Sequence, residues 1–177
     1  MDKVQWLETK LKAHKILQEM LYECAVDMVN AGLPIQPERV DGIYIQKVKK
    51  AQAVCSFRPD ENDELLFSIM IDEQFANHME DEVVLANVKD SIYHELLHTC
   101  PDCQSHNDNW LDVAVECDAK LGTHTRTRQD DEIYYNKAHG MEIATYECSH
   151  CGFKFETVND YGNYIYCPID KEKLYKK

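Results

Sequence analysis

Residues 84–110 read VLANVKDSIYHELLHTCPDCQSHNDNW, and this stretch decides how the chain is organised. Its apolar side chains recur at helical spacing, which predicts a helix over about residues 80–99. Cys100-Pro101 ends the pattern, because proline disfavours helix in the residue before it. A second periodic run predicts another helix over about residues 107–121, with Gly122 at its C-cap. Two helices joined by a short loop therefore form the centre of the fold.

The first of these helices carries the motif His94-Glu95-Leu96-Leu97-His98. Residues four apart share a helix face, so the imidazoles of His94 and His98 can bind one zinc ion. Glu95 can then reach a water on the metal, whose pKa zinc lowers to about 7. The pattern predicts hydrolysis by a zinc-activated water with Glu95 as general base. Such a triplet also arises by chance, but this one lies on a strongly periodic helix whose apolar face is offset from it.

A catalytic zinc ion usually has three protein ligands and one open position, so a third ligand is expected. The extended metzincin pattern HExxHxxGxxH is absent. His106 is the next imidazole downstream of His98 and stands at the predicted start of the following helix. It is the favoured third ligand. Glu116, on the same helix, is the alternative, and His124 lies in less patterned sequence.

The C-terminal part of the chain contains cysteines with metal-ligand spacing. Cys148-Ser149-His150-Cys151-Gly152 is a zinc-knuckle sequence, and Cys167-Pro168-Ile169-Asp170 has an aspartate in the fourth ligand position. Three arrangements remain open: Asp170 completes the site, His150 or His139 supplies the fourth ligand, or the metal has been lost. A small unit without metal has little core to hold it, which favours bound zinc. The predicted ligand set is Cys148, Cys151, Cys167 and Asp170.

The rest of the chain predicts an α+β fold. An amphipathic N-terminal helix ends at the sequence Asn30-Ala31-Gly32-Leu33-Pro34. Three apolar runs follow, near residues 43–48, 53–57 and 65–71, and the polar run between the last two predicts a hairpin. We expect a small antiparallel sheet beside the helices.

The composition restricts partners and compartment. The 177 residues carry a net charge of −13, which disfavours nucleic acid as a partner, because phosphates attract positive patches. Neither a signal peptide nor a membrane-spanning run is recognisable, so a cytoplasmic protein is expected. Its eight cysteines are then thiols or metal ligands. Cys100 and Cys103 are a redox pair, half a metal site, or residues that shape the loop before His106, and the last is favoured.

The run HELLHTCPDCQSHNDNW at residues 94–110 resembles the core of the SprT-like zinc metallopeptidases, which include the Spartan proteases. His106 opens a short motif that ends in Trp110, as in that family, although Asn107 replaces its frequent glycine. The HELLHTCPxC run is most similar to a bacterial and phage-like branch. The resemblance covers roughly residues 5–175.

The resemblance implies a peptidase core over residues 1–122, a linker over 123–144 and a zinc-ribbon-like unit over 145–177. It implies a protein or peptide substrate, one catalytic zinc ion, a second structural one, and action on DNA-associated proteins as a further possibility. An edge strand, expected at Phe67–Ile71, would align the substrate, and the alternative is that these residues form an ordinary core strand. Tyr134 and Tyr135 are candidates for stabilising the oxyanion. The alternatives are a zinc-dependent binding module without catalysis, for nucleic acid or a protein partner, and hydrolysis of a non-protein amide.

Overall fold

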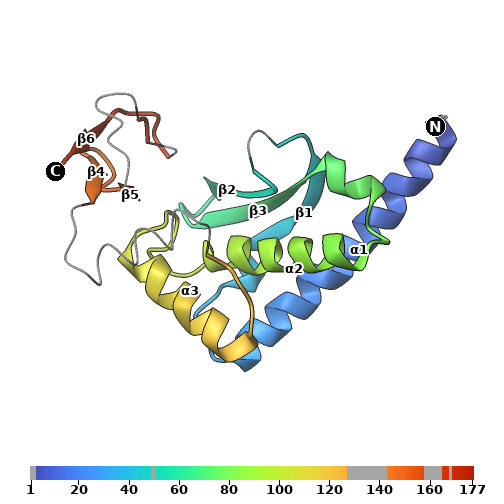
Figure 1. Cartoon of the computed structure of the whole chain (residues 1–177). Coiled ribbons are helices and arrows are strands. Elements are labelled where there is room, and N and C mark those ends of the chain that lie inside the picture. The colour runs from blue at the N-terminus through green and yellow to red at the C-terminus, as the bar shows by residue number, and fades with distance from the viewer. Residues whose placement is uncertain (1–2, 49–50, 127–142, 158–164, 168) are drawn as a thin grey trace.

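The computed structural model of the chain describes residues 3–48, 51–126, 143–157, 165–167 and 169–177. Within these ranges it contains three α-helices and two three-stranded sheets, so the predicted α+β class is confirmed (Figure 1). The three helices pack with the first sheet, whereas the second sheet has a small core of its own. The division of the chain at residues 122 and 144 stays a prediction.

Helix α1 (Lys3–Asn30) packs one face against the rest of the fold. It ends where Gly32 has a φ of 73°, and the amide of Leu33 donates to the carbonyl of Met28 at 3.0 Å. The predicted stop is therefore confirmed. The N-terminal turns of α1 extend beyond the other elements (Figure 1). Its buried residues lie four or seven positions apart: Ala13, Leu17, Cys24 and Met28.

Strands β1 (Val40–Gln46), β2 (Ala53–Pro59) and β3 (Leu65–Asp72) form the first sheet in the order β1-β3-β2. The predicted hairpin joins β2 and β3, which pair antiparallel. Strand β1 pairs parallel to β3, so the expectation of a wholly antiparallel sheet is wrong. Parallel pairing joins segments distant in the sequence and leaves no local turn signal.

The segment Phe67–Ile71 lies in the central strand, so its expected place at a sheet edge is also wrong. The cause is its apolar character, because β3 is the most buried strand of this sheet and pairs on both sides. Strands β1 and β2 are the edges. The edge strand β2 packs against the helix that carries the His-Glu-His motif.

Helix α2 (Glu82–Leu97) carries that motif in its last turns. Short 3-10 helices, η1 (Pro37–Arg39) before β1 and η2 (Glu73–Asn77) after β3, complete the frame. The side chain of Asp81 caps α2 by accepting from the amides of the first turn. The helix is two residues shorter at each end than predicted. Its buried face includes Val88, Ile92 and Leu96 and packs against α1 and the sheet.

Helix α3 (Asp108–Leu121) follows the loop after α2. Asn107 is its N-cap and accepts from the amide of Trp110 at 2.9 Å. Gly122 is its C-cap with a φ of 67°, as predicted. The short side chain of Asn107 therefore has a structural role at the position where the resembled family often has glycine.

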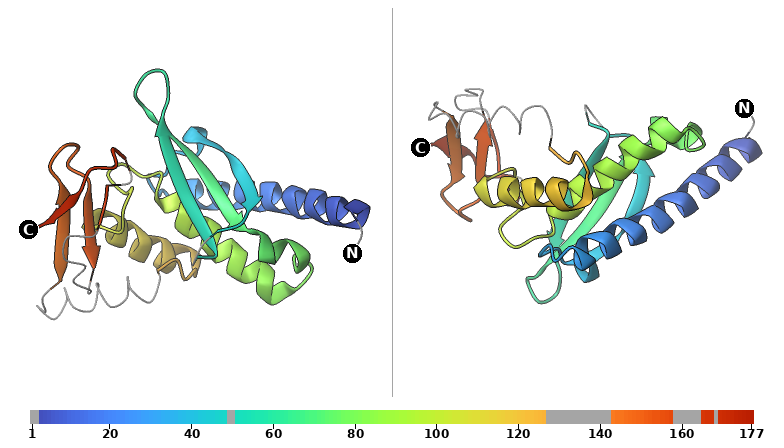
Figure 2. Two further views of the ribbon diagram at one scale, coloured as in Figure 1. Left: turned by 90° about the horizontal axis from the view of Figure 1, so that it is seen from above. Right: turned by 60° about the horizontal axis from the view of Figure 1, so that its bottom comes forward.

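The second sheet contains β4 (Ala144–Cys148), β5 (Lys154–Thr157) and β6 (Leu174–Lys176) in the order β5-β4-β6, and both pairings are antiparallel. It lies at the end of the molecule opposite the N-terminus (Figure 2). In the described part of the chain, no helix has the length and apolar character needed to cross a bilayer.

Candidate metal centres

Three imidazoles meet between α2 and α3, and we call them the histidine centre: His94, His98 and His106. His94 lies in the last turn of α2, His98 caps that helix, and His106 lies in the loop before α3. The Nε2 atom of His106 is 3.1 Å from Nε2 of His94 and 3.3 Å from Nε2 of His98. Tetrahedral zinc ligands at 2.0–2.1 Å from the metal lie about 3.3 Å apart. The three nitrogens therefore fit one zinc ion.

Backbone carbonyls fix the orientation of two of these rings. Nδ1 of His94 lies 2.6 Å from the carbonyl oxygen of Thr125, and Nδ1 of His98 lies 2.9 Å from that of Cys103. A carbonyl only accepts, so each Nδ1 carries the proton and donates it. Each Nε2 atom is left with its lone pair directed at the metal position.

Trp110 closes the inner side of the histidine centre. Its ring is fully buried and stacks on His106, with centroids 4.1 Å apart and an interplanar angle of 16°. The same indole contacts the ring of His94 at a centroid distance of 4.9 Å. Trp110, which ends the short motif, therefore restricts the position of the His106 ring by packing against its buried face.

Glu95 lies next to the histidine centre and is only 5% exposed. Burial raises the pKa of its carboxyl group, while His94 and the backbone N–H of Cys55 lower it. An open cleft of about 460 Å³ lies beside these groups. It is lined by residues 51–53 before and at the start of β2, by α2, by His106 and by residues 124–126. A substrate in this cleft would meet the metal position and Glu95 together.

The alternative ligands do not join the histidine centre. Glu116 is exposed and pairs with Lys120 at 2.5 Å. His124 lines the cleft but is not part of the ligand group. Tyr134 and Tyr135 lie outside the described residues, so their expected role stays a prediction.

The C-terminal unit brings together a second group, which we call the ribbon centre: Cys148, Cys151, Cys167 and Asp170. The ligand atoms all lie within 4.8 Å of one another. The Sγ atoms of Cys151 and Cys167 are 3.4 Å apart, and Oδ2 of Asp170 is 3.3 Å from Sγ of Cys148. Three thiolates and a carboxylate are a donor set that zinc accepts.

Two similar turns build the ribbon centre. The amide of Gly152 donates to the carbonyl of Cys148, and that of Lys171 to the carbonyl of Cys167, each at 3.0 Å. Gly152 has a φ of 75° and Lys171 a φ of 62°, so the left-handed residue follows the second ligand in both turns. Asp170 thus occupies the position that corresponds to Cys151.

The surroundings of Asp170 favour its charged form. Desolvation raises the pKa of this carboxyl, but the amide of Glu172 and hydrogen bonds from the cysteine thiols lower it to about 2. The exposed His150 is not part of the ligand group, and His139 lies outside the described residues. Among the arrangements left open by the sequence, the described residues favour Asp170 as the fourth ligand.

Cys100 and Cys103 are buried in the turn after α2. The amide of Cys103 donates to the carbonyl of Cys100 at 3.2 Å, and Asp102 has a φ of 60° within that turn. Neither thiol belongs to a ligand group among the described residues. The turn presents the carbonyl of Cys103 to His98, so the geometry supports the prediction that this pair shapes the loop before His106.

The carbonyl groups that orient His94 and His98 had no signal in the sequence, because a backbone acceptor is independent of residue type.

Comparison with known proteins adds no further constraint, since the chain matches no protein-family model, no curated protein and no solved structure.

Proposed function

We propose that the chain is a SprT-like zinc metallopeptidase that hydrolyses peptide bonds at the histidine centre. One observation carries the proposal: three Nε2 atoms converge at zinc-ligand spacing, beside the buried carboxylate of Glu95, at the wall of an open cleft. A purely structural zinc site is normally closed by four protein ligands. Three ligands and an adjacent carboxylate are typical of a hydrolytic site.

Zinc, when bound, supplies Lewis acidity that polarises a substrate carbonyl and acidifies a water molecule. Glu95 accepts the proton from the attacking water and later passes it to the leaving amine nitrogen. Its burial suits this role, because a raised pKa brings a carboxylate closer to the pKa useful in proton transfer. The carbonyls of Thr125 and Cys103 keep the proton on Nδ1 of His94 and His98.

The edge of β2 offers a place for an extended peptide. The amide of Asp72 donates to the carbonyl of Gln52 at 2.9 Å, so these two residues face each other across the ladder. Backbone groups alternate along an antiparallel strand, and those of Ala53 and Cys55 therefore point away from β3. Cys55 uses its amide on Glu95, whereas Ala53 lies at the cleft. A substrate strand can pair there and pass the metal position.

The test is cleavage of an unfolded protein by the purified chain. We expect cleavage with zinc bound, loss of cleavage after the metal is removed by a chelator, and recovery when zinc is restored. Absence of cleavage by the zinc-loaded chain, with both zinc positions filled, would contradict the proposal. Unstructured peptides and non-protein amides in the same assay separate peptidase activity from hydrolysis of other amides.

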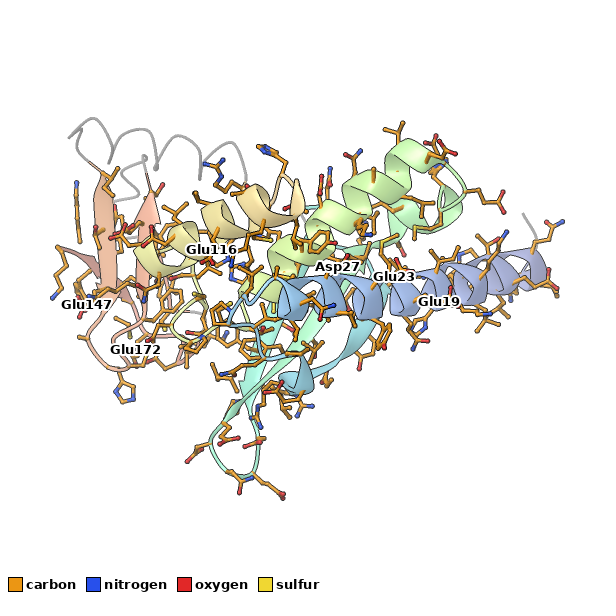
Figure 3. All side chains as sticks on the ribbon, turned by 90° about the horizontal axis from the view of Figure 1, so that it is seen from below. Glu19, Glu23, Asp27, Glu116, Glu147 and Glu172 are labelled. Carbon is orange, nitrogen blue, oxygen red and sulfur yellow. The ribbon has the colours of Figure 1, made fainter. Side chains whose placement is uncertain are left out.

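A parallel arm with single-stranded DNA tests action on DNA-associated proteins. Charge argues against strong DNA binding, because the net charge of the chain is −13. Figure 3 labels six acidic residues that lie between α1 and the C-terminal unit: Glu19, Glu23, Asp27, Glu116, Glu147 and Glu172. We expect cleavage without DNA and little stimulation by it.

The second candidate is a zinc-dependent binding module without catalysis, and the ribbon centre is the observation that favours it. In that case a partner would bind the C-terminal unit, and Cys148→Ser would abolish binding. Glu95→Gln would leave the function of the protein unchanged. The two candidates therefore make opposite predictions for Glu95.

A further inference from the structure

We propose that Asp118 is a positioning residue for the histidine centre, which it serves by holding the Thr125 carbonyl against His94. The inference rests on the proposed function, since it assumes that the three imidazoles bind zinc. It concerns a residue on the C-terminal half of α3 that makes no contact of its own with the metal position.

The carboxylate of Asp118 is only 12% exposed and holds the segment that follows α3. Its Oδ1 atom accepts from the amide of Thr125 at 2.8 Å and from its hydroxyl at 2.9 Å. The same atom accepts from the hydroxyl of Thr123 at 2.9 Å, and Oδ2 accepts from Nε of Arg126 at 3.2 Å. Bonds to a charged acceptor are stronger than neutral ones, so one side chain fixes three residues of this segment.

The segment has no secondary structure of its own, and a second carboxylate, that of Asp90 on α2, accepts a hydrogen bond from the backbone N–H of His124. Residues 123–126 follow the left-handed Gly122 and belong to neither helix nor strand. Thr125 is nevertheless only 3% exposed, and its carbonyl accepts from Nδ1 of His94 at 2.6 Å. The position of Thr125, and with it that of its carbonyl, therefore depends on the hydrogen bonds that Asp118 accepts from its amide and hydroxyl.

His98 is supported differently. Its carbonyl partner, Cys103, lies in a tight turn that is closed by a backbone hydrogen bond to Cys100. Loss of Asp118 should thus release the ring of His94 and leave that of His98 in place. Groups that orient metal-binding histidines change metal affinity by about 10- to 100-fold when they are removed.

The test follows the nitrogen NMR signals of the imidazole rings in the full chain while a chelator buffers the free zinc concentration. These signals report zinc binding at the histidine centre separately from zinc binding by the cysteine thiolates. We expect Asp118→Ala to weaken zinc binding at the three imidazoles by about 10- to 100-fold. In metal-free Asp118→Ala, the neutral ring of His94 should no longer be held in the one tautomer that carries its proton on Nδ1. Asp118→Asn keeps an oxygen for Thr125 but loses the charge, so its effect should be smaller. Asp112 is an exposed carboxylate on the same helix, so Asp112→Ala is the control. Its zinc affinity and His94 signal should equal those of the protein without substitutions.

An unchanged zinc affinity and an unchanged His94 signal in folded Asp118→Ala would overturn the inference. If Asp118→Ala does not fold, Asp118→Asn and Thr125→Val decide in its place, and affinities within about twofold of the unchanged protein in both would overturn it. Failure of the proposed function has a different signature, because the unchanged protein would then bind no zinc at its imidazoles or bind it without cleaving peptides.

Discussion

The histidine centre and the ribbon centre differ in the scaffold that surrounds them. The first lies between two helices, within a core to which α1, α2, α3 and the first sheet all contribute. The second lies in a unit whose buried core has four residues, two of which belong to the candidate ligand group: Tyr146, Cys148, Cys167 and Leu174. We therefore expect the core around the histidine centre to fold before metal binds and the C-terminal unit to need its metal for folding. Under the proposed function, metal would serve chemistry in one centre and stability in the other.

Breaking the ribbon centre should have the largest structural effect. Structural zinc contributes about 10–16 kcal/mol to the folding of small zinc domains. We expect Cys148→Ser, or removal of zinc, to expose the amides of β4–β6 to rapid hydrogen exchange while α1–α3 stay protected. His150→Ala is the matched control, because this exposed side chain lies in the same turn outside the ligand group. Retained protection of β4–β6 without metal would show that the hairpins pack unaided.

Breaking the histidine centre should have the opposite signature. His106→Ala removes one of three ligands, so it should lose the catalytic zinc ion and cleavage together but keep the fold. Glu116→Ala tests the alternative third ligand and should retain both, because Glu116 pairs with Lys120. Bound zinc, cleavage and circular dichroism are measured on each protein. A zinc-loaded, active His106→Ala protein would rule out this assignment.

The fourth ligand of the ribbon centre gives a finer test of the comparison. Asp170→Cys should keep the unit folded and tighten its zinc binding, since thiolates suit zinc in structural sites. Asp170→Ala should weaken binding. Cobalt substitution reports the change directly, because each added thiolate strengthens the sulfur-to-cobalt absorption. Equal absorption in Asp170→Cys and the unchanged protein would mean that position 170 does not bind the metal.

The smallest effect is expected at the end of α3. Gly122 has a φ of 67°, and an added Cβ would meet no neighbouring atom. Gly122→Ala should therefore cost only the backbone strain of a left-handed residue, about 1 kcal/mol of the free energy of unfolding of the part of the chain that contains α1–α3. Gly122→Asn should cost less, since asparagine tolerates this conformation. Denaturation with urea measures the free energy of unfolding of both variants. Hydrogen exchange of the amides in β4–β6 should be the same as in the protein without substitutions. No difference between alanine and asparagine would contradict the strain argument.

Most of what was predictable from the sequence was local. Helical periodicity and cap residues located α2 and α3 to within two residues, and spacing alone grouped Cys148, Cys151, Cys167 and Asp170. The parallel pairing of β1 with β3 was missed, because it joins residues 40–46 to 67–72 with no turn between them. Strand β3 lies in the centre of the sheet, which agrees with the alternative of an ordinary core strand and not with the expected edge strand.

The environment of the histidine centre was less predictable than its ligands. His94 and His98 are marked by helical spacing, and His106 by its place before a helix. Asp118 gave no signal, because an aspartate near the end of a helix is usually solvated. Its proposed role depends on the hydrogen bonds that join residues 123–126 to α3 and to His94, and these are tertiary contacts that no local pattern predicts.

The most direct test of the account is a comparison of the zinc-loaded chain with Glu95→Gln, with bound zinc and cleavage of an unfolded protein measured on the same samples. General acid–base groups contribute about 10²- to 10⁴-fold to rate, and the metal ligands are untouched by this change. We expect cleavage to fall by that factor while zinc at the histidine centre is retained. Equal cleavage by the two proteins would remove Glu95 from the reaction. Cleavage by neither, with zinc bound, would favour the binding module instead.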